Sequence, residues 1–246
     1  MIISKKYKYI FISHQCSGGT AISNELIAKY KGEKIYHKHC NFPSIILNQE
    51  IKNWNTYTVF AVIRNPLDKA YSQYNKIKLN ANNQFTDKSF FYENGGVVTN
   101  KMRKLYSAVQ NINSFEEYLG YRYNFMPYDD NVSINSKYIT SFIRFEYLAK
   151  DFLKILKMLN IENVRELPLV NKTEKIDSLE NVNTDNINKH FLPYLNKNKR
   201  FFNNNTAKAI PKLSKLYFNI YSYFREKKVI SMDQKYIREK RGLSHK

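Results

Sequence analysis

Cysteine is scarce in this chain of 246 residues, which contains only Cys16 and Cys40. There is no CxxC pair and no group of cysteines and histidines at zinc-ligand spacing, so nothing indicates a zinc finger or ribbon. Two cysteines are also too few for a disulfide framework, which favours a reducing compartment. A single bridge between Cys16 and Cys40 is left open by the sequence.

Long apolar runs are missing as well. No stretch approaches the roughly 20 apolar residues that a membrane-crossing helix needs, so we expect no membrane span. The first 13 residues, MIISKKYKYIFIS, have no separate apolar region or cleavage site, and they predict a first strand rather than a signal peptide. We therefore expect a cytoplasmic, bacterial-type protein, with the soluble portion of a membrane-anchored Golgi enzyme as the alternative.

Acidic residues are in the minority: 21 Asp and Glu stand against 40 Lys and Arg, giving a formal net charge of +19. Such a charge favours a polyanionic partner, which includes nucleic acid, a phosphorylated cofactor, an acidic polysaccharide or a membrane surface. The alternative is compositional drift, because Lys, Asn, Ile and Tyr are all abundant. No helix-turn-helix spacing, zinc finger or RNP-type aromatic motif is found, so specific nucleic-acid binding is the least favoured hypothesis.

The hydrophobic pattern alternates between strands and helices. Residues 57–63, YTVFAVI, are almost all apolar, as is typical of a buried parallel strand. We predict further strands at 7–13, 34–36 and 137–143. Helices are predicted at 20–30, 43–52, 67–78 and 145–161. Another is predicted to begin at the Ser114–Glu117 capping box, and two more lie around 184–200 and 206–227, before a frayed basic tail from 233 to 246. This alternation predicts an α/β fold, with a central parallel sheet flanked by helices in a single domain.

The stretch HQCSGGTAISNEL, residues 14–26, links the first long strand to a helix. Gly18 and Gly19 allow the backbone to approach an anion, and the amides at the helix N-terminus attract it. Ser17 and Thr20 add hydroxyl donors. The stretch is not a Walker A loop, because no lysine precedes the threonine. The alternative is a tight turn between strand and helix with no ligand.

A second motif, FAVIRNPLDKAYSQY, covers residues 60–74. Arg64 leaves the end of the buried strand, and Ser72 lies two turns along the next helix. An arginine and a hydroxyl in these positions can grip one phosphate from two sides. The alternative is an arginine that caps a surface loop.

Together, the Gly-Gly-Thr loop and the downstream R-N-P-x-[DE]-[RK]-x-x-S-x-Y pattern resemble the sulfotransferases that use 3′-phosphoadenosine 5′-phosphosulfate (PAPS). The resemblance implies a P-loop-NTPase-like sulfotransferase fold and no metal. It also implies that Arg64 and Ser72 bind the 3′-phosphate, with Lys69 replacing a frequent arginine. The 5′-phosphosulfate loop would comprise Cys16, Ser17, Gly18, Gly19, Thr20 and Ala21.

Two later stretches extend the resemblance. Residues 142–161, FIRFEYLAKDFLKILKMLNI, are similar to the strand, Arg-Phe-Glu and helix that follow the acceptor region in this family. Residues 167–175, LPLVNKTEK, are similar to a late loop that closes over the nucleotide, which would place Lys172, Thr173 and Lys175 near phosphate. The resemblance covers roughly residues 8–175, and it leaves a C-terminal helical extension of about 180–246 unassigned.

The motif IYHKHCNF, residues 35–42, contains His37 and His39. In an extended segment both side chains point to the same side. A metal pair would need further ligands, which no nearby cluster supplies, and two surface histidines are the plainest alternative. Carbohydrate sulfotransferases of the uronyl 2-O type carry a similar Tyr-His-x-His here. The resemblance implies that His37 deprotonates an acceptor hydroxyl and that His39 helps to bind or orient the acceptor.

Cys16 departs from the family, which most often has lysine there. That lysine neutralises charge growing on the leaving oxygen, and losing such a group typically lowers the rate about a hundredfold. A thiolate would carry the wrong sign. Either another cation, Lys38, Lys172 or Lys175, replaces it, or the enzyme is slow, or the site has been engineered, or the chain only binds the nucleotide or a glycan. We expect a PAPS-dependent sulfotransferase that acts on a carbohydrate hydroxyl, possible acceptors including uronic-acid glycans, and that releases the bisphosphate nucleotide PAP.

Overall fold

The computed structural model describes residues 1–48, 51–124, 126–168, 184–202 and 212–240. It divides into two compact units, each of which is described by itself. The sheet unit contains Met1–Asn65, Asp129–Asn171 and Pro193–Lys246, and the helical unit contains Pro66–Tyr128 and Lys172–Leu192. The expectation of a single domain stays a prediction. The predicted nucleotide-loop residues Lys172, Thr173 and Lys175 lie outside the described residues.

A five-stranded mixed sheet forms the centre of the sheet unit, with strand order β3-β1-β2-β4-β5. β2, β4 and β5 are parallel to one another, while β1 is antiparallel to both of its neighbours. The predicted α/β class is therefore confirmed, but the sheet is only mostly parallel. The strands are β1 (Ile2–Ser4), β2 (Tyr9–Ile12), β3 (Glu33–Lys34), β4 (Thr58–Ile63) and β5 (Ser141–Arg144).

The antiparallel strand arises because the N-terminal residues form a hairpin instead of one strand. Lys5 and Lys6 are exposed in the turn, and Lys8 takes a left-handed conformation with φ of 51°. These lysines interrupt the apolar sequence, so the buried residues on either side pair with each other. The predicted strand at residues 7–13 is present as β2, but the separate strand β1 that precedes it was not predicted.

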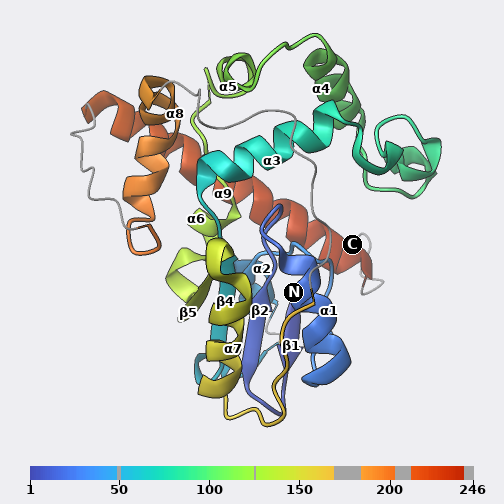
Figure 1. Cartoon of the computed structure of the whole chain (residues 1–246), viewed down its shortest axis with the longest axis vertical. Coiled ribbons are helices and arrows are strands. Elements are labelled where there is room, and N and C mark those ends of the chain that lie inside the picture. Colours follow the sequence, from blue (N-terminus) through green and yellow to red (C-terminus); the bar gives the residue numbers. More distant parts are fainter. Residues whose placement is uncertain (49–50, 125, 169–183, 203–211, 241–246) are drawn as a thin grey trace. The chain divides into compact units, whose positions relative to one another are not determined.

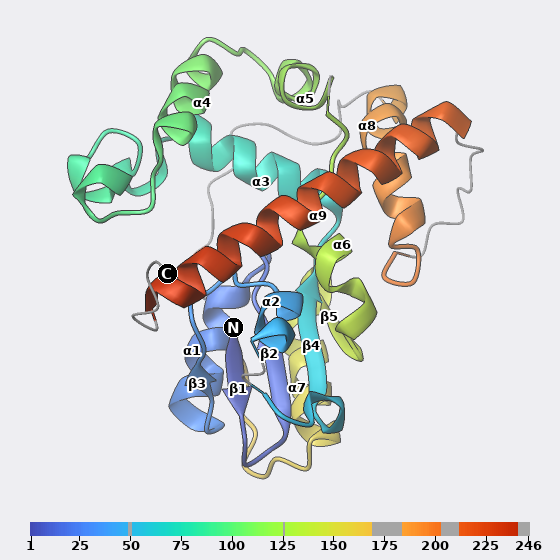
Figure 2. The same ribbon diagram turned by 180° about the vertical axis from the view of Figure 1, so that it is seen from behind.

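Helices cover both faces of the sheet (Figures 1 and 2). On one face, Phe11, Phe60 and Ile143 pack with residues of α1 (Gly19–Lys29) and α7 (Leu148–Met158) in one hydrophobic core. On the other side lie α2 (Phe42–Leu47) and α6 (Asn131–Asn135), which pack against each other. The loop between β2 and α1 lies at the carboxyl end of the parallel strand β2. Open α/β sheets bind ligands at this end of their strands.

The C-terminal helix α9 (Lys212–Lys240) corrects the sequence prediction of a helix that stops near 227 and a frayed tail. The helix continues to Lys240, and it packs against α2. Asp233 and Ile237, one helical turn apart, are both buried. Because the tail is rich in basic residues, its sequence did not indicate that one side of the helix is buried.

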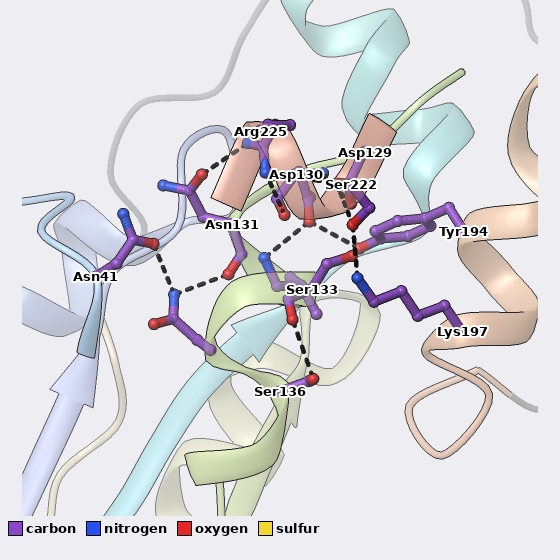
Figure 3. Close-up of polar contacts among 12 residues, drawn as sticks. Asn41, Asp129, Asp130, Asn131, Ser133, Ser136, Tyr194, Lys197, Ser222 and Arg225 are labelled. Atoms are coloured by element: carbon purple, nitrogen blue, oxygen red, sulfur yellow. Dashed lines mark hydrogen bonds and ion pairs between the residues drawn. The ribbon is translucent and has the colours of Figure 1, made fainter. Parts of the chain in front are cut away.

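A polar cluster fastens α9 to the segment that begins α6 (Figure 3). Arg225 donates to the carbonyl of Asp130 at 3.0 Å and to Oδ1 of Asn131 at 2.8 Å. Ser222 donates to the fully buried carboxylate of Asp129 at 2.9 Å. Burial raises the pKa of Asp129, while the Arg225 guanidinium acts in the opposite direction. The cluster fixes the position of α9 and therefore of the side chains that follow along it.

The helical unit is built on aromatic packing. Tyr71, Tyr74, Phe115 and Tyr118 contact one another at ring-centroid distances of 5.0–6.1 Å. The predicted N-cap is present, since Ser114 accepts from the amide of Glu117 at 3.1 Å. Glu117 itself reaches the amide of the preceding Asn113 and not that of Ser114. The helices are α3 (Pro66–Lys78), α4 (Asn100–Gln110) and α5 (Phe115–Tyr123), with α8 (Thr184–Lys197) divided between the two units. No helix among the described residues is both long enough and apolar enough to cross a membrane.

Candidate functional site: an anion-binding loop beside two histidines

The loop between β2 and α1 has the backbone that the sequence predicted. Gly18 is left-handed, with φ of 70°, and the first turn of α1 has neither a side-chain cap nor an acidic residue. A side chain at Gly19 would place its Cβ only 2.3 Å from the hydroxyl oxygen of Ser13. The two glycines therefore allow a close turn that leaves the positive end of the helix without a capping side chain. This end of α1 is suited to an anion.

Two cationic side chains reach this loop. The ammonium of Lys38 donates to the hydroxyl of Thr20 at 2.6 Å, and Arg64 donates to the carbonyl of Cys16 at 2.8 Å. The Arg64 guanidinium also lies 4.0 Å from the ring centre of Phe145, in the Arg-Phe-Glu motif. Of the candidate replacements for the loop lysine, Lys38 is the one that belongs to the described residues, and it contacts the loop.

Three further residues of the predicted 5′ loop, Cys16, Ser17 and Ala21, contribute to the conformation of the loop. Ser17 is buried, and its hydroxyl donates to the carbonyl of His14 at 2.7 Å. Ala21 is buried in the core on α1. Cys16 is left-handed, with φ of 52°, and partly exposed. Both it and the buried Cys40 are free, so the bridge that the sequence left open is not formed.

His39 is held against the start of the loop. Its Nδ1–H donates to the carbonyl of Ser13 at 2.7 Å, which leaves Nε2 as an acceptor. Burial lowers the pKa of His39 to about 4, although the hydrogen bond to Ser13 opposes that shift. The ring is therefore neutral at pH 7 and is suited to orienting a bound group.

This burial predicts a pH dependence of stability. The unfolded chain binds a proton at His39 below pH 6.5, but the folded chain does so only near pH 4. The free energy of unfolding should therefore fall by up to about 3 kcal/mol between these pH values, because protons favour the unfolded state. Urea unfolding at several pH values checks this by comparing the wild type with His39→Gln. An equal loss of stability in both proteins would contradict it.

His37 forms a dyad with Asp233 of α9. The Nε2–H of His37 donates to Oδ1 of Asp233 at 2.9 Å, and the carboxylate is 7% exposed. Its other oxygen, Oδ2, accepts from the backbone and side-chain amides of Asn41 and from the hydroxyl of Ser44. Burial opposes the ionisation of Asp233, but the bonds from His37 and Asn41 outweigh it and lower its pKa. An ionised Asp233 thus fixes the ring of His37 and leaves its Nδ1 to accept a proton.

A buried hydrogen-bonded chain connects this dyad to the loop. The side-chain amide of Asn135 donates to Oδ1 of Asn41 at 3.0 Å and lies 3.3 Å from Nε2 of His14, which precedes the loop. Asn41 in turn donates to Asp233. Sequence reasoning missed Asn41, Asn135 and Asp233, which come from three distant segments. For Asp233, the available signal was its position one helical turn before the apolar Ile237, which places both residues on the same side of the helix.

His37, Cys40 and Asp233 also offer one ligand atom each within 4.8 Å of one another. Cys40 directly follows His39 in the sequence, and the structure adds Asp233 from α9. Burial, however, raises the pKa of the Cys40 thiol to about 12, which disfavours the thiolate that a metal would require. The close hydrogen bond between His37 and Asp233 fits a proton-transfer dyad better than a metal centre.

The structure brings together the 5′ loop, Lys38, His39 and Arg64, all in the sheet unit. Ser72 lies on α3 in the helical unit, so its pairing with Arg64 on a 3′-phosphate stays a prediction. Comparisons of the chain with family models, curated proteins and solved structures found no match. The case for a family therefore depends on the quoted motifs and on the geometry of the site.

Proposed function

We propose that this protein is a sulfotransferase that moves the sulfuryl group of PAPS to a hydroxyl of a carbohydrate. The observation that carries the proposal is the hydrogen bond from Lys38 to Thr20 at the N-terminus of α1. It brings a cation to the loop whose own lysine is replaced by Cys16. A glycine turn with this cation can hold a phosphate-type anion and neutralise charge on it.

Residues of the loop and its surroundings would hold the donor. PAPS supplies an activated sulfuryl group bonded to a phosphate oxygen. The amides at Gly18 and Gly19, the hydroxyl of Thr20 and the ammonium of Lys38 would bind its 5′ end. Arg64 would bind the 3′-phosphate together with Ser72, as the resemblance implies. These donors fit the group, because all of them carry N–H or O–H bonds or positive charge.

His37 would act on the acceptor. Its Nδ1 takes the proton from the acceptor hydroxyl as the new O–S bond forms and the bond from sulfur to the phosphate oxygen breaks. The ionised Asp233 stabilises the imidazolium, as the aspartate does in hydrolytic triads. His39, neutral and bound to Ser13, is suited to orienting the acceptor. The net charge of +19 favours an acidic acceptor such as a uronic-acid glycan.

Binding of PAP tests the donor site directly. At a concentration 100 times its Kd, PAP should stabilise the protein by about 2.7 kcal/mol, measured as a rise in Tm. Arg64→Gln should remove most of this shift. Arg103→Gln is a matched control, because Arg103 also lies over a ring, that of Phe91, at 4.2 Å. A wild-type Tm that does not respond to saturating PAP would sink the proposal.

A second candidate is a protein that binds the nucleotide or a glycan without transfer, and Cys16 favours it. The two functions separate when labelled PAPS is incubated with a panel of acidic and neutral glycans. Transfer of the label supports the enzyme. Binding of PAP with no transfer to any acceptor supports the second candidate, provided that introducing lysine by Cys16→Lys produces activity.

A further inference from the structure

The N-terminal half of α9 exposes a stripe of large apolar side chains. Their relative exposures range from 49 to 80%, and they lie at spacings of three, four and seven residues, which places them on one side of the helix. The opposite side is buried, as Phe218 and Ser222 show. We call this set the apolar stripe: Leu213, Leu216, Tyr217, Ile220, Tyr223 and Phe224.

The same side of α9 becomes basic in its C-terminal half. Lys227 follows Ile220 by seven residues, and Lys228 follows Phe224 by four, so both continue the line of the stripe. Further along, Lys235 and Arg238 are exposed on this side as well. We call these four residues the basic end: Lys227, Lys228, Lys235 and Arg238.

From this pattern we infer that α9 docks on a membrane surface that contains anionic phospholipid. Helices that lie in the membrane interface bury leucine and aromatic residues and carry lysine and arginine on their polar face. On α9 the basic residues instead follow the apolar stripe along the same exposed side, because the opposite side is packed against the protein. The apolar stripe would enter the boundary between headgroups and acyl chains, to a depth of about 5–10 Å. The basic end would contact anionic headgroups, and the net charge of +19 would add to the attraction.

A second copy of the chain fits this surface less well. Lys212 and Lys215 flank the start of the stripe, and Lys227 and Lys228 follow its end, all of them exposed. Whether two helices paired in parallel or antiparallel, lysines of one copy would face lysines of the other. In addition, the stripe covers 12 residues, about 18 Å of a helix about 11 Å wide, which is an area of roughly 200 Å². A stable dimer buries about 800 Å² on each partner. A surface of anionic lipid would neutralise these lysines, whereas a second copy of the chain would repel them.

Sedimentation of the full chain with lipid vesicles tests the inference. We expect binding to vesicles of mixed phosphatidylcholine and phosphatidylserine, and much weaker binding to phosphatidylcholine alone. The double variant Tyr223→Gln, Phe224→Gln should reduce the partition coefficient roughly tenfold or more. Lys227→Gln with Lys228→Gln should reduce it about 25-fold, and added salt should reduce wild-type binding in the same direction.

Matched control variants distinguish docking through α9 from non-specific binding to vesicles. Tyr121 and Tyr92 are exposed to 57 and 71%, comparable to Tyr223 and Phe224, so their double replacement by glutamine should leave binding unchanged. Lys101→Gln with Lys104→Gln is the matched charge control. Circular dichroism should show equal helix content in all variants, since the replaced residues are exposed.

Three results would overturn the inference. The first is a wild-type protein that stays in solution with phosphatidylserine vesicles. The second is vesicle binding that both the stripe variant and its control retain. The third is a concentration-dependent dimer, seen without lipid by light scattering, that the stripe variant abolishes. The inference does not depend on the proposed sulfotransferase, because none of these measurements requires donor or acceptor.

Discussion

Replacing His37 by glutamine should lower the rate of sulfuryl transfer about a thousandfold, within the range of 10²–10⁴ typical of a lost general base. Glutamine can still donate a hydrogen bond toward Asp233, but it has no nitrogen that accepts the proton of the acceptor hydroxyl. Binding of PAP should be unaffected, because the donor loop does not depend on this side chain. Initial rates with labelled PAPS, together with the Tm shift from PAP, measure both properties in the same preparation.

Asp233→Asn is the companion variant for the same dyad. The amide would no longer stabilise the imidazolium of His37, so kcat should fall at least about tenfold while the KM for PAPS stays near its wild-type value. Glu25→Gln is the matched control, since Glu25 is also a buried carboxylate in an ion pair, with Arg165 at 2.6 Å. Should both variants lose activity equally, or His37→Gln keep wild-type rates, His37 is not the base.

Replacing Lys38 by methionine should lower the rate of transfer about a hundredfold, because a preorganised charge beside the leaving oxygen is lost. Methionine keeps the length of the side chain and removes only its charge and hydrogen bonds. Lys34→Met is the control, since Lys34 is exposed on the nearby strand β3. Steady-state kinetics with labelled PAPS should show the loss mainly in kcat.

The double variant Cys16→Lys, Lys38→Met sharpens this test. If Lys38 substitutes for the missing loop lysine, restoring lysine at Cys16 should recover a large part of the lost rate. The same replacement in the wild type should have a much smaller effect, since the charge is already supplied. A wild type that is inactive until Cys16→Lys is introduced would instead indicate a donor-binding protein that has lost transfer. Equal activity of Lys38→Met and wild type would remove Lys38 from the mechanism.

Local patterns in the sequence predicted much of the fold. The apolar run of residues 57–63 became β4, and the spacing of apolar residues at 148–159 became α7. The glycine turn before α1 was also predicted, because Gly18 is the residue type that tolerates a left-handed backbone. These features depend on neighbours in the chain, so a single sequence contains the information for them.

In the candidate site, local patterns predicted some residues but not their partners. His37 and His39 were chosen from a short motif, and Lys38 was named among the possible replacements for the loop lysine. Their partners could not be predicted in the same way. Asp233 lies 196 positions along the chain from His37, in a segment whose basic residues indicated a frayed tail. No local pattern records a hydrogen bond between residues so far apart.

By itself, the sequence determined the class of fold, the position of the glycine turn and the excess of positive charge, because each follows from residue type and short-range spacing. Tertiary structure alone decided that the N-terminal residues fold back as a hairpin and that α9 delivers a carboxylate to His37. It also decided that Lys38, and not a residue of the loop, donates to Thr20. The physical reason is that burial and long-range hydrogen bonds determine which distant side chains meet, and these arise only when the sheet and its helices pack.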